Sequence, residues 1–194
     1  MAKRIDTTTN ETWQGHAKVR ELVLTGMMTS LLCVMGPLSV PLPFSPVPIS
    51  LTNLAVYFAL YVLGRKRACV SYLLYLLIGF AGIPVFSGFT AGPGKLLGPT
   101  GGYLVGFMLM ALIGGYVTDR WPFRPAWCFA GLAGGTAVCY LFGTLWLAGL
   151  AHMSLAGALA AGVLPFIPGD ICKIIIALVT GPVIRKRLDR AGGN

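Results

Sequence analysis

The stretch Pro168–Ile184 reads PGDICKIIIALVTGPVI and decides the fold class of the chain. Apart from Asp170 and Lys173 it carries no charge, and Ile, Leu and Val dominate the residues after the lysine. An ionisable group in or beside hydrocarbon costs several kcal/mol unless it is paired or functional. The stretch therefore predicts a membrane helix in which Asp170 and Lys173 mark a site.

The composition of the whole chain agrees with a membrane protein. Of the 194 residues, 56% are hydrophobic and only 11% are charged, which leaves too few charges to cover a soluble globule of this length. Backbone groups in lipid must find their hydrogen bonds internally, and no period-two alternation suggests barrel strands. We therefore expect an all-α integral membrane protein.

Six apolar stretches, separated by turn or charge signals, predict a six-helix bundle. Several are shorter than the roughly 20 residues that span a bilayer, and the second and third are the shortest. The stretches are approximately Leu22–Val40, Ile49–Leu63, Ala68–Ile83, Gly101–Val117, Ala126–Ala148 and Pro168–Ile184. The apolar segment Met153–Leu164 favours a short re-entrant or interfacial helix over a seventh span.

The bundle is expected to form one membrane domain over residues 1–194. Residues 1–21 make a polar arm, residues 22–184 the bundle and residues 185–194 a basic tail. All Lys and Arg residues except Lys95 and Lys173 fall in the arm, the tail and two alternate turns. Loops rich in Lys and Arg stay in the cytoplasm, so both termini are predicted to be cytoplasmic. The same clustering argues against nucleic acid as a partner despite the net charge of +9.

The spacing of the cysteines and of the glycine-rich loop argues against several kinds of site. The five cysteines lie mostly in apolar stretches without CxxC spacing, so neither a disulfide framework nor a zinc site is expected. The glycine-rich loop does not match the phosphate-binding motif G-x-x-x-x-G-K-[ST]. Gly88 is one residue too far from Gly94-Lys95, and Leu96 stands where the motif has a hydroxyl. We therefore expect no catalytic residue, metal, cofactor or nucleotide site.

Asp170 and Lys173 admit three interpretations. Asp170 follows Pro168-Gly169 and suits the positive end of a helix, where it could act as an N-cap. Residues three apart share a helix face, so the two could also form a structural ion pair. Apolar replacements are often at least as stable as such pairs, which favours a third role, the binding of a ligand.

The loop from Gly82 to Leu104 is rich in glycine and carries Lys95 as its only charge. Its glycines allow a close approach of backbone to a small ligand, or simply tight packing. Phe86, Phe89 and Tyr103 are candidates to enclose an apolar ring. Thr100 is a candidate ligand contact or the N-cap of the next helix. Within that helix, Gly102 and Gly106 fit a small-residue contact between helices.

Two further segments contain candidate residues for ligand binding or partner docking. Residues 41–48 contain four prolines, whose fixed φ angles predict a stiff, extended lid that is not helical. Asn53, just after it, is either a ligand contact or an amide bonded between helices. On the first helix, Gly26 and Ser30 permit a close approach by a partner or by the bundle itself.

Several motifs together resemble one family. PVPISLTNLAV, LGRKR, GIPVFSG, LLGPTGGYLVGF and PGDICK occur in this order from the second helix to the sixth. This succession resembles the BioY family, the biotin-specific S components of energy-coupling factor (ECF) transporters. The resemblance implies a six-helix subunit in the cell membrane that captures biotin at the outer face. It also implies partnership with a transmembrane coupling subunit and two cytoplasmic ATPase subunits.

The resemblance carries over to particular residues. The family's acid and lysine fall on Asp170 and Lys173, and Asn53 stands where the family often has Gln. The first-helix Ala-x-x-x-Ala that S components use for docking corresponds to Gly26 and Ser30. Residues 87–94 depart from the glycine string that many members have.

The chemistry of biotin matches these candidates, because its ureido group, apolar chain and carboxylate ask for an acceptor, a donor or cation, and aromatic walls. Asp170 is expected to accept a hydrogen bond from a ureido N–H, and Lys173 is expected to donate a charge-assisted hydrogen bond to the ligand. One alternative is a solitary or oligomeric biotin transporter without ATPase subunits. Another is an intramembrane enzyme, which is disfavoured because His16 and His152 are the only histidines and no nucleophile is paired with either.

Overall fold

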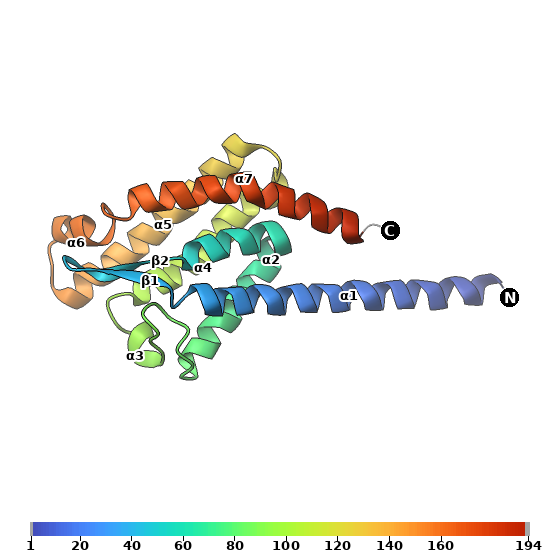
Figure 1. The fold of residues 1–194 in the computed structure, drawn as a ribbon, viewed down its shortest axis with the longest axis horizontal. Helices are drawn as coiled ribbons and strands as arrows, with labels where there is room; N and C mark the ends of the chain where they lie inside the picture. Colours follow the sequence, from blue (N-terminus) through green and yellow to red (C-terminus); the bar gives the residue numbers. More distant parts are fainter. Residues whose placement is uncertain (1, 193–194) are drawn as a thin grey trace.

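The computed structural model describes the backbone of residues 2–192 and the side chains of residues 18–190. The described chain is mainly helical. Its elements are α1 (Ala2–Met35), β1 (Ser39–Leu42), β2 (Ser45–Ser50), α2 (Thr52–Phe80), α3 (Pro93–Leu96), α4 (Gly101–Arg120), α5 (Pro125–Ala151), α6 (Leu155–Gly162) and α7 (Ile167–Gly192). Figure 1 shows the first turn of α1 and the last turn of α7 at one end of the bundle, with β1, β2, α3 and α6 at the opposite end.

The polar arm and the first apolar stretch form the single helix α1, which ends at Met35. The next residue must be glycine, because a Cβ on Gly36 would come within 2.4 Å of the Val85 carbonyl oxygen. Pro37 then follows. The expected helix up to Val40 is therefore wrong in its last residues, since Ser39–Leu42 form strand β1.

The proline-rich segment forms a two-stranded antiparallel hairpin. Ser39 pairs with Ser50 and Val40 with Ile49, and the register is irregular between Val40 and Leu42. The extended, non-helical backbone that the prolines predict is confirmed. The pairing of the two halves was not expected from the sequence. Proline lacks an N–H, so it restricts which backbone groups of a strand can pair.

Helix α2 contains most of the second and third apolar stretches as two segments that meet at Gly64. The expected helix bounds are wrong at the outer ends, since Ile49 and Ser50 belong to β2 and residues 81–83 follow the end of α2. The φ of 72° and ψ of 169° at this glycine lie outside the helical range, in a region that residues with a Cβ rarely adopt. The N–H of Arg65 is then free of the helix and donates to Oδ2 of Asp119 on α4 at 3.0 Å. The turn predicted between the two stretches is thus a sharp break at one residue.

Small residues bring α4 and α5 close together, as the sequence predicts. A Cβ on Gly102 would lie 2.3 Å from Cβ of Trp146, and one on Gly106 would lie 2.8 Å from Sγ of Cys139. Neither position has room for a side chain. This close approach fixes where α5 places its inward-facing residues.

Three helices of the described chain are long and apolar enough to cross a membrane, namely α4, α5 and residues 167–190 of α7. The two segments of α2 are each shorter than a usual span and are separated by the basic turn that begins at Arg65. Helix α6, with 8 residues, is too short to cross, in keeping with the short helix expected there.

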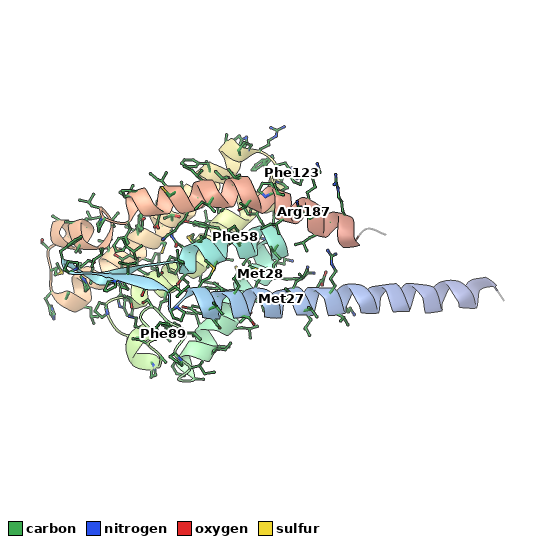
Figure 2. The ribbon with its side chains drawn as sticks, in the orientation of Figure 1. Met27, Met28, Phe58, Phe89, Phe123 and Arg187 are labelled. Carbon is green, nitrogen blue, oxygen red and sulfur yellow. The ribbon has the colours of Figure 1, made fainter. Side chains whose placement is uncertain are left out.

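Large apolar side chains cover the outside of the bundle. Leu22 is 78% exposed and Val179 is 66% exposed, an arrangement suited to lipid and not to water. Figure 2 shows side chains projecting around the bundle, with Met27 on α1 and Arg187 near the end of α7. The apolar surface and the mainly helical fold together describe an integral membrane protein.

Candidate functional site

A cavity opens at the end of the bundle that carries the hairpin. Its wall takes residues from β2, the start of α2, the glycine-rich loop, α4, α5 and α7. The empty space, counted together with the open solvent at its mouth, is about 630 Å³. Polar and aromatic side chains converge on this cavity, which makes it the candidate site for a small ligand.

Asp170 and Lys173 lie together in the cavity wall, on the first turns of α7. Nζ of the lysine is 3.0 Å from Oδ1 of the aspartate, and the two residues are only 7% and 8% exposed. Helix α7 begins at Ile167, before Pro168, so Asp170 is inside the first turn and does not occupy the N-cap position. The N-cap interpretation of Asp170 is thus wrong.

Two side chains from other helices donate to the same carboxylate. Nδ2 of Asn53, at the start of α2, donates to Oδ1 of Asp170 at 2.8 Å. The hydroxyl of Tyr140, on α5, donates to Oδ2 at 2.5 Å. Three helices thus converge on one buried carboxylate. Such a satisfied network holds the acid in a fixed orientation.

Sequence reasoning found Asn53 but missed Tyr140. Asn53 is polar at the start of an apolar stretch, which draws attention to it, whereas Tyr140 is flanked by Cys139 and Leu141 within an uncharged helix. An aromatic residue in that setting resembles any other core residue. Only the three-dimensional packing of α5 against α7 brings its hydroxyl to Asp170.

The ammonium of Lys173 uses all three of its N–H groups. It donates to the backbone oxygen of Ser50 at 2.7 Å, to Oδ1 of Asn53 at 3.0 Å and to Oδ1 of Asp170 at 3.0 Å. The bond to Ser50 ties the end of β2 to α7. A carboxylate and an ammonium thus lie side by side in the cavity wall, and a ligand that accepts from the ammonium would replace one of these three bonds.

Aromatic residues form part of the wall, but not all those named from the sequence. Tyr103 lines the cavity together with Tyr75, Phe107 and Phe166. Tyr103 is held by a bond from its hydroxyl to the Gly162 carbonyl oxygen at 2.9 Å. These rings provide the apolar surface that a ring-shaped ligand requires.

Phe86 and Phe89 lie outside the cavity wall. Phe86 is fully buried behind it, edge-on to Tyr75 with ring centroids 5.5 Å apart, and it fills the space that Gly79 leaves free. Phe89 is 68% exposed and lies beside α3 in Figure 2. The structure therefore gives Phe86 a place in the core and brings neither ring to the cavity.

Thr100 occupies the N-cap position of α4, but its hydroxyl makes no capping hydrogen bond. The side chain lines the cavity and is only 7% exposed. Its Oγ1 is buried and has no hydrogen-bond partner. A capping role for the hydroxyl is excluded by this geometry.

Lys95 lies on α3 and is not part of the cavity wall. Partial burial lowers the pKa of its ammonium from the ordinary value. Among the residues that the structure describes as lining the cavity, Lys173 is the only cation.

Gly26 and Ser30 lie on α1 and do not line the cavity. A Cβ on Gly26 would meet nothing within 4 Å, and Ser30 is exposed with its hydroxyl bonded to the Gly26 carbonyl oxygen at 3.0 Å. Met27 is 61% and Val34 is 65% exposed. This face of α1 is therefore not used to pack the bundle, whereas Met28 and Leu32 on the same helix are buried in the core.

Comparisons with known proteins agree on one family. The model of the BioY family matches residues 7–190. The biotin transporter BioY of Thermotoga maritima is 34% identical over 87% of this chain and 97% of its own length. The probable biotin transporter BioY of Pyrococcus horikoshii is 38% identical over 84% of this chain and 94% of its own.

A solved structure has the same fold. The crystal structure of the S-component for biotin from an ECF-type ABC transporter superposes with a TM-score of 0.82 at 28% identity. The match covers 88% of this chain and 93% of the other. The helical arrangement found here is therefore that of an ECF S-component.

Proposed function

The chain belongs to the BioY family, and from this premise we propose that the cavity beside Asp170 and Lys173 is its biotin site. The function is biotin uptake, with this chain as the substrate-binding membrane subunit. Its family consists of transporter components, so the chain is not an enzyme.

The observation that carries the site assignment is the buried network around Asp170. A carboxylate and an ammonium, each less than a tenth exposed, are held by Asn53, Tyr140 and the end of β2. Burying two charges is costly even when they are paired. Their position in the wall of a cavity, and not in the packed core, is the arrangement expected of groups that serve a ligand.

Biotin suits this wall. Its ureido ring carries N–H donors beside a carbonyl acceptor, and the wall carries an acceptor beside a donor in Asp170 and Lys173. Its fused ring system fits the apolar surface of Tyr103 and the neighbouring rings. Phe89 is not included in the site, because it lies outside the cavity.

The proposed topology has six spans and cytoplasmic termini. The spans are α1, the two segments of α2 on either side of Gly64, α4, α5 and α7. Together with the arm of residues 1–21 and the tail of residues 185–194 they make one domain in the cell membrane. The distribution of Lys and Arg supports this orientation, which places the hairpin and the cavity at the outer face.

The proposed partners are those of an ECF module, a transmembrane coupling subunit and two cytoplasmic ATPases. The support is the likeness to an ECF S-component and the unused face of α1 around Gly26 and Ser30. Small residues on an exposed face let another helix approach closely. In this arrangement the chain selects biotin and the module supplies the energy.

The test has a binding arm and a transport arm. Titration of purified, detergent-solubilised protein with radiolabelled biotin is expected to give saturable binding of one biotin per chain. Proteoliposomes that also contain the ECF module and internal ATP are expected to accumulate biotin, whereas those with the chain alone are not. Accumulation by the chain alone would support the solitary transporter instead, and absence of saturable binding would refute the site.

A further inference from the structure

Biotin has two polar ends, and the Asp170–Lys173 pair has room for one of them. This inference rests on the proposed function. The ureido ring and the carboxylate lie at opposite ends of an aliphatic chain, while Oδ1 of Asp170 and Nζ of Lys173 are only 3.0 Å apart. The second polar end must therefore meet a different part of the wall.

The pair suits the ureido end better than the carboxylate. A cyclic urea places an N–H donor next to a carbonyl acceptor, which complements an aspartate next to a lysine. A ligand carboxylate at the same place would lie against the Asp170 carboxylate and be repelled in a site shielded from water. The carboxylate end is therefore the one that needs another partner.

Most other polar side chains in the wall already have partners. The Thr136 hydroxyl bonds to Tyr57, and the Tyr75 hydroxyl donates to the Val85 carbonyl oxygen. The Ser50 hydroxyl donates to Thr52. Within the described residues these groups would have to give up an existing bond in order to hold the ligand.

Thr100 differs from them. Three buried side-chain oxygens in the described part of the chain have no hydrogen-bond partner, those of Tyr61, Thr100 and Thr144. Of these, Thr100 alone lines the cavity. A buried hydroxyl without a partner costs about 1–3 kcal/mol, and a ligand oxygen that accepts its proton would remove this cost.

The surroundings of Thr100 favour an anion. Thr100 directly precedes α4, a helix of 20 residues, whose first turn carries the positive end of the helix dipole. Within the described residues, Asp170 is the only acid that lines the cavity, and it is already bonded to three side chains. A carboxylate at Thr100 would meet a donor and a favourable potential.

We propose that the start of α4, through the Thr100 hydroxyl, is the carboxylate subsite of the cavity, with the ureido ring held by Asp170 and Lys173. The ligand then lies across the cavity from α7 to α4, with its aliphatic chain along the aromatic wall. The cavity would thus distinguish free biotin from neutral derivatives at Thr100 and recognise the ring at Asp170.

The test compares two ligands on matched variants. Biotin and its neutral methyl ester are titrated calorimetrically into wild-type protein and into Thr100→Val, which keeps the shape of the side chain and removes the hydroxyl. We expect Thr100→Val to weaken biotin about tenfold or more, as for a hydrogen bond to a charged group, and to weaken the methyl ester clearly less, by about two- to tenfold, because its ester carbonyl accepts only a neutral hydrogen bond. Thr100→Ser should bind biotin like the wild type.

A matched control uses the other buried threonine. Thr144 also has a buried hydroxyl without a partner but lies outside the cavity wall, so Thr144→Val should change neither affinity. Equal weakening of both ligands by Thr100→Val, or no weakening of either, overturns the carboxylate subsite. Failure of wild-type protein to bind either ligand would instead contradict the proposed function, so the two failures are distinguishable.

Discussion

Replacing both members of the Asp170–Lys173 pair with neutral residues separates a structural ion pair from a binding pair. Asp170→Asn keeps the shape of the carboxylate, and Lys173→Met keeps the length and much of the volume of the lysine. Both residues are less than a tenth exposed. A purely structural pair predicts that the double variant folds and binds normally, whereas a binding pair predicts that it folds but does not bind.

The structure sets the expected magnitudes. Either single substitution leaves one buried charge without its partner, which costs about 3–5 kcal/mol of stability. The double substitution removes both charges and should recover most of that loss. Replacing both members of a buried ion pair with uncharged residues often changes the free energy of unfolding very little. For binding, each charge-assisted bond lost costs about 1.5–3 kcal/mol, or roughly 10- to 150-fold in affinity.

Two measurements on the same protein preparations distinguish a structural ion pair from a binding pair. Thermal unfolding in detergent should show low melting temperatures for the single variants and a near wild-type value for the double variant. Calorimetric titration with biotin should show the double variant weakened by about 100-fold or more, from two lost charge-assisted bonds. A stable double variant with wild-type affinity would refute the reasoning.

Three further predictions follow from other parts of the structure. Tyr140→Phe removes one donor to Asp170 and should weaken biotin binding by about two- to tenfold in calorimetry, as for a typical hydrogen bond. The melting temperature should change by no more than a few degrees. Unchanged affinity would contradict the role of the hydroxyl. Gly79→Ala places a Cβ 2.2 Å from a buried ring and should lower stability by about 1–3 kcal/mol in thermal unfolding, whereas Gly134→Ala, where a Cβ meets nothing within 4 Å, should not. Ser30→Leu on the unused face of α1 should abolish co-purification with an ECF module and leave biotin affinity intact; normal assembly would rule out docking there.

The helices were predictable because lipid imposes a simple rule on the sequence. Chain segments in hydrocarbon must be apolar and internally bonded, so the uncharged stretches that end at basic turns correspond to helices. The break at Gly64 was visible only as a basic turn, since a single left-handed glycine inside α2 leaves no periodic signal. The hairpin was missed because proline predicts extended backbone but not which strand it will pair with.

The site was predictable only where a residue contrasts with its surroundings. Asp170, Lys173 and Asn53 are polar at the ends of apolar stretches, and the structure joins them in one network. Tyr140 gave no such contrast. Phe89 was expected at the site as an aromatic ring of the glycine-rich loop, yet it is 68% exposed at a loop position with a positive φ of 56°.

The structure of the protein with biotin bound is the most direct test of the central claim. We expect the ureido ring within hydrogen-bonding distance, ~3 Å, of the Asp170 carboxylate and the Lys173 ammonium, enclosed by the aromatic wall. Biotin bound at another surface, or bound in the cavity with its ring away from both charged groups, would contradict it.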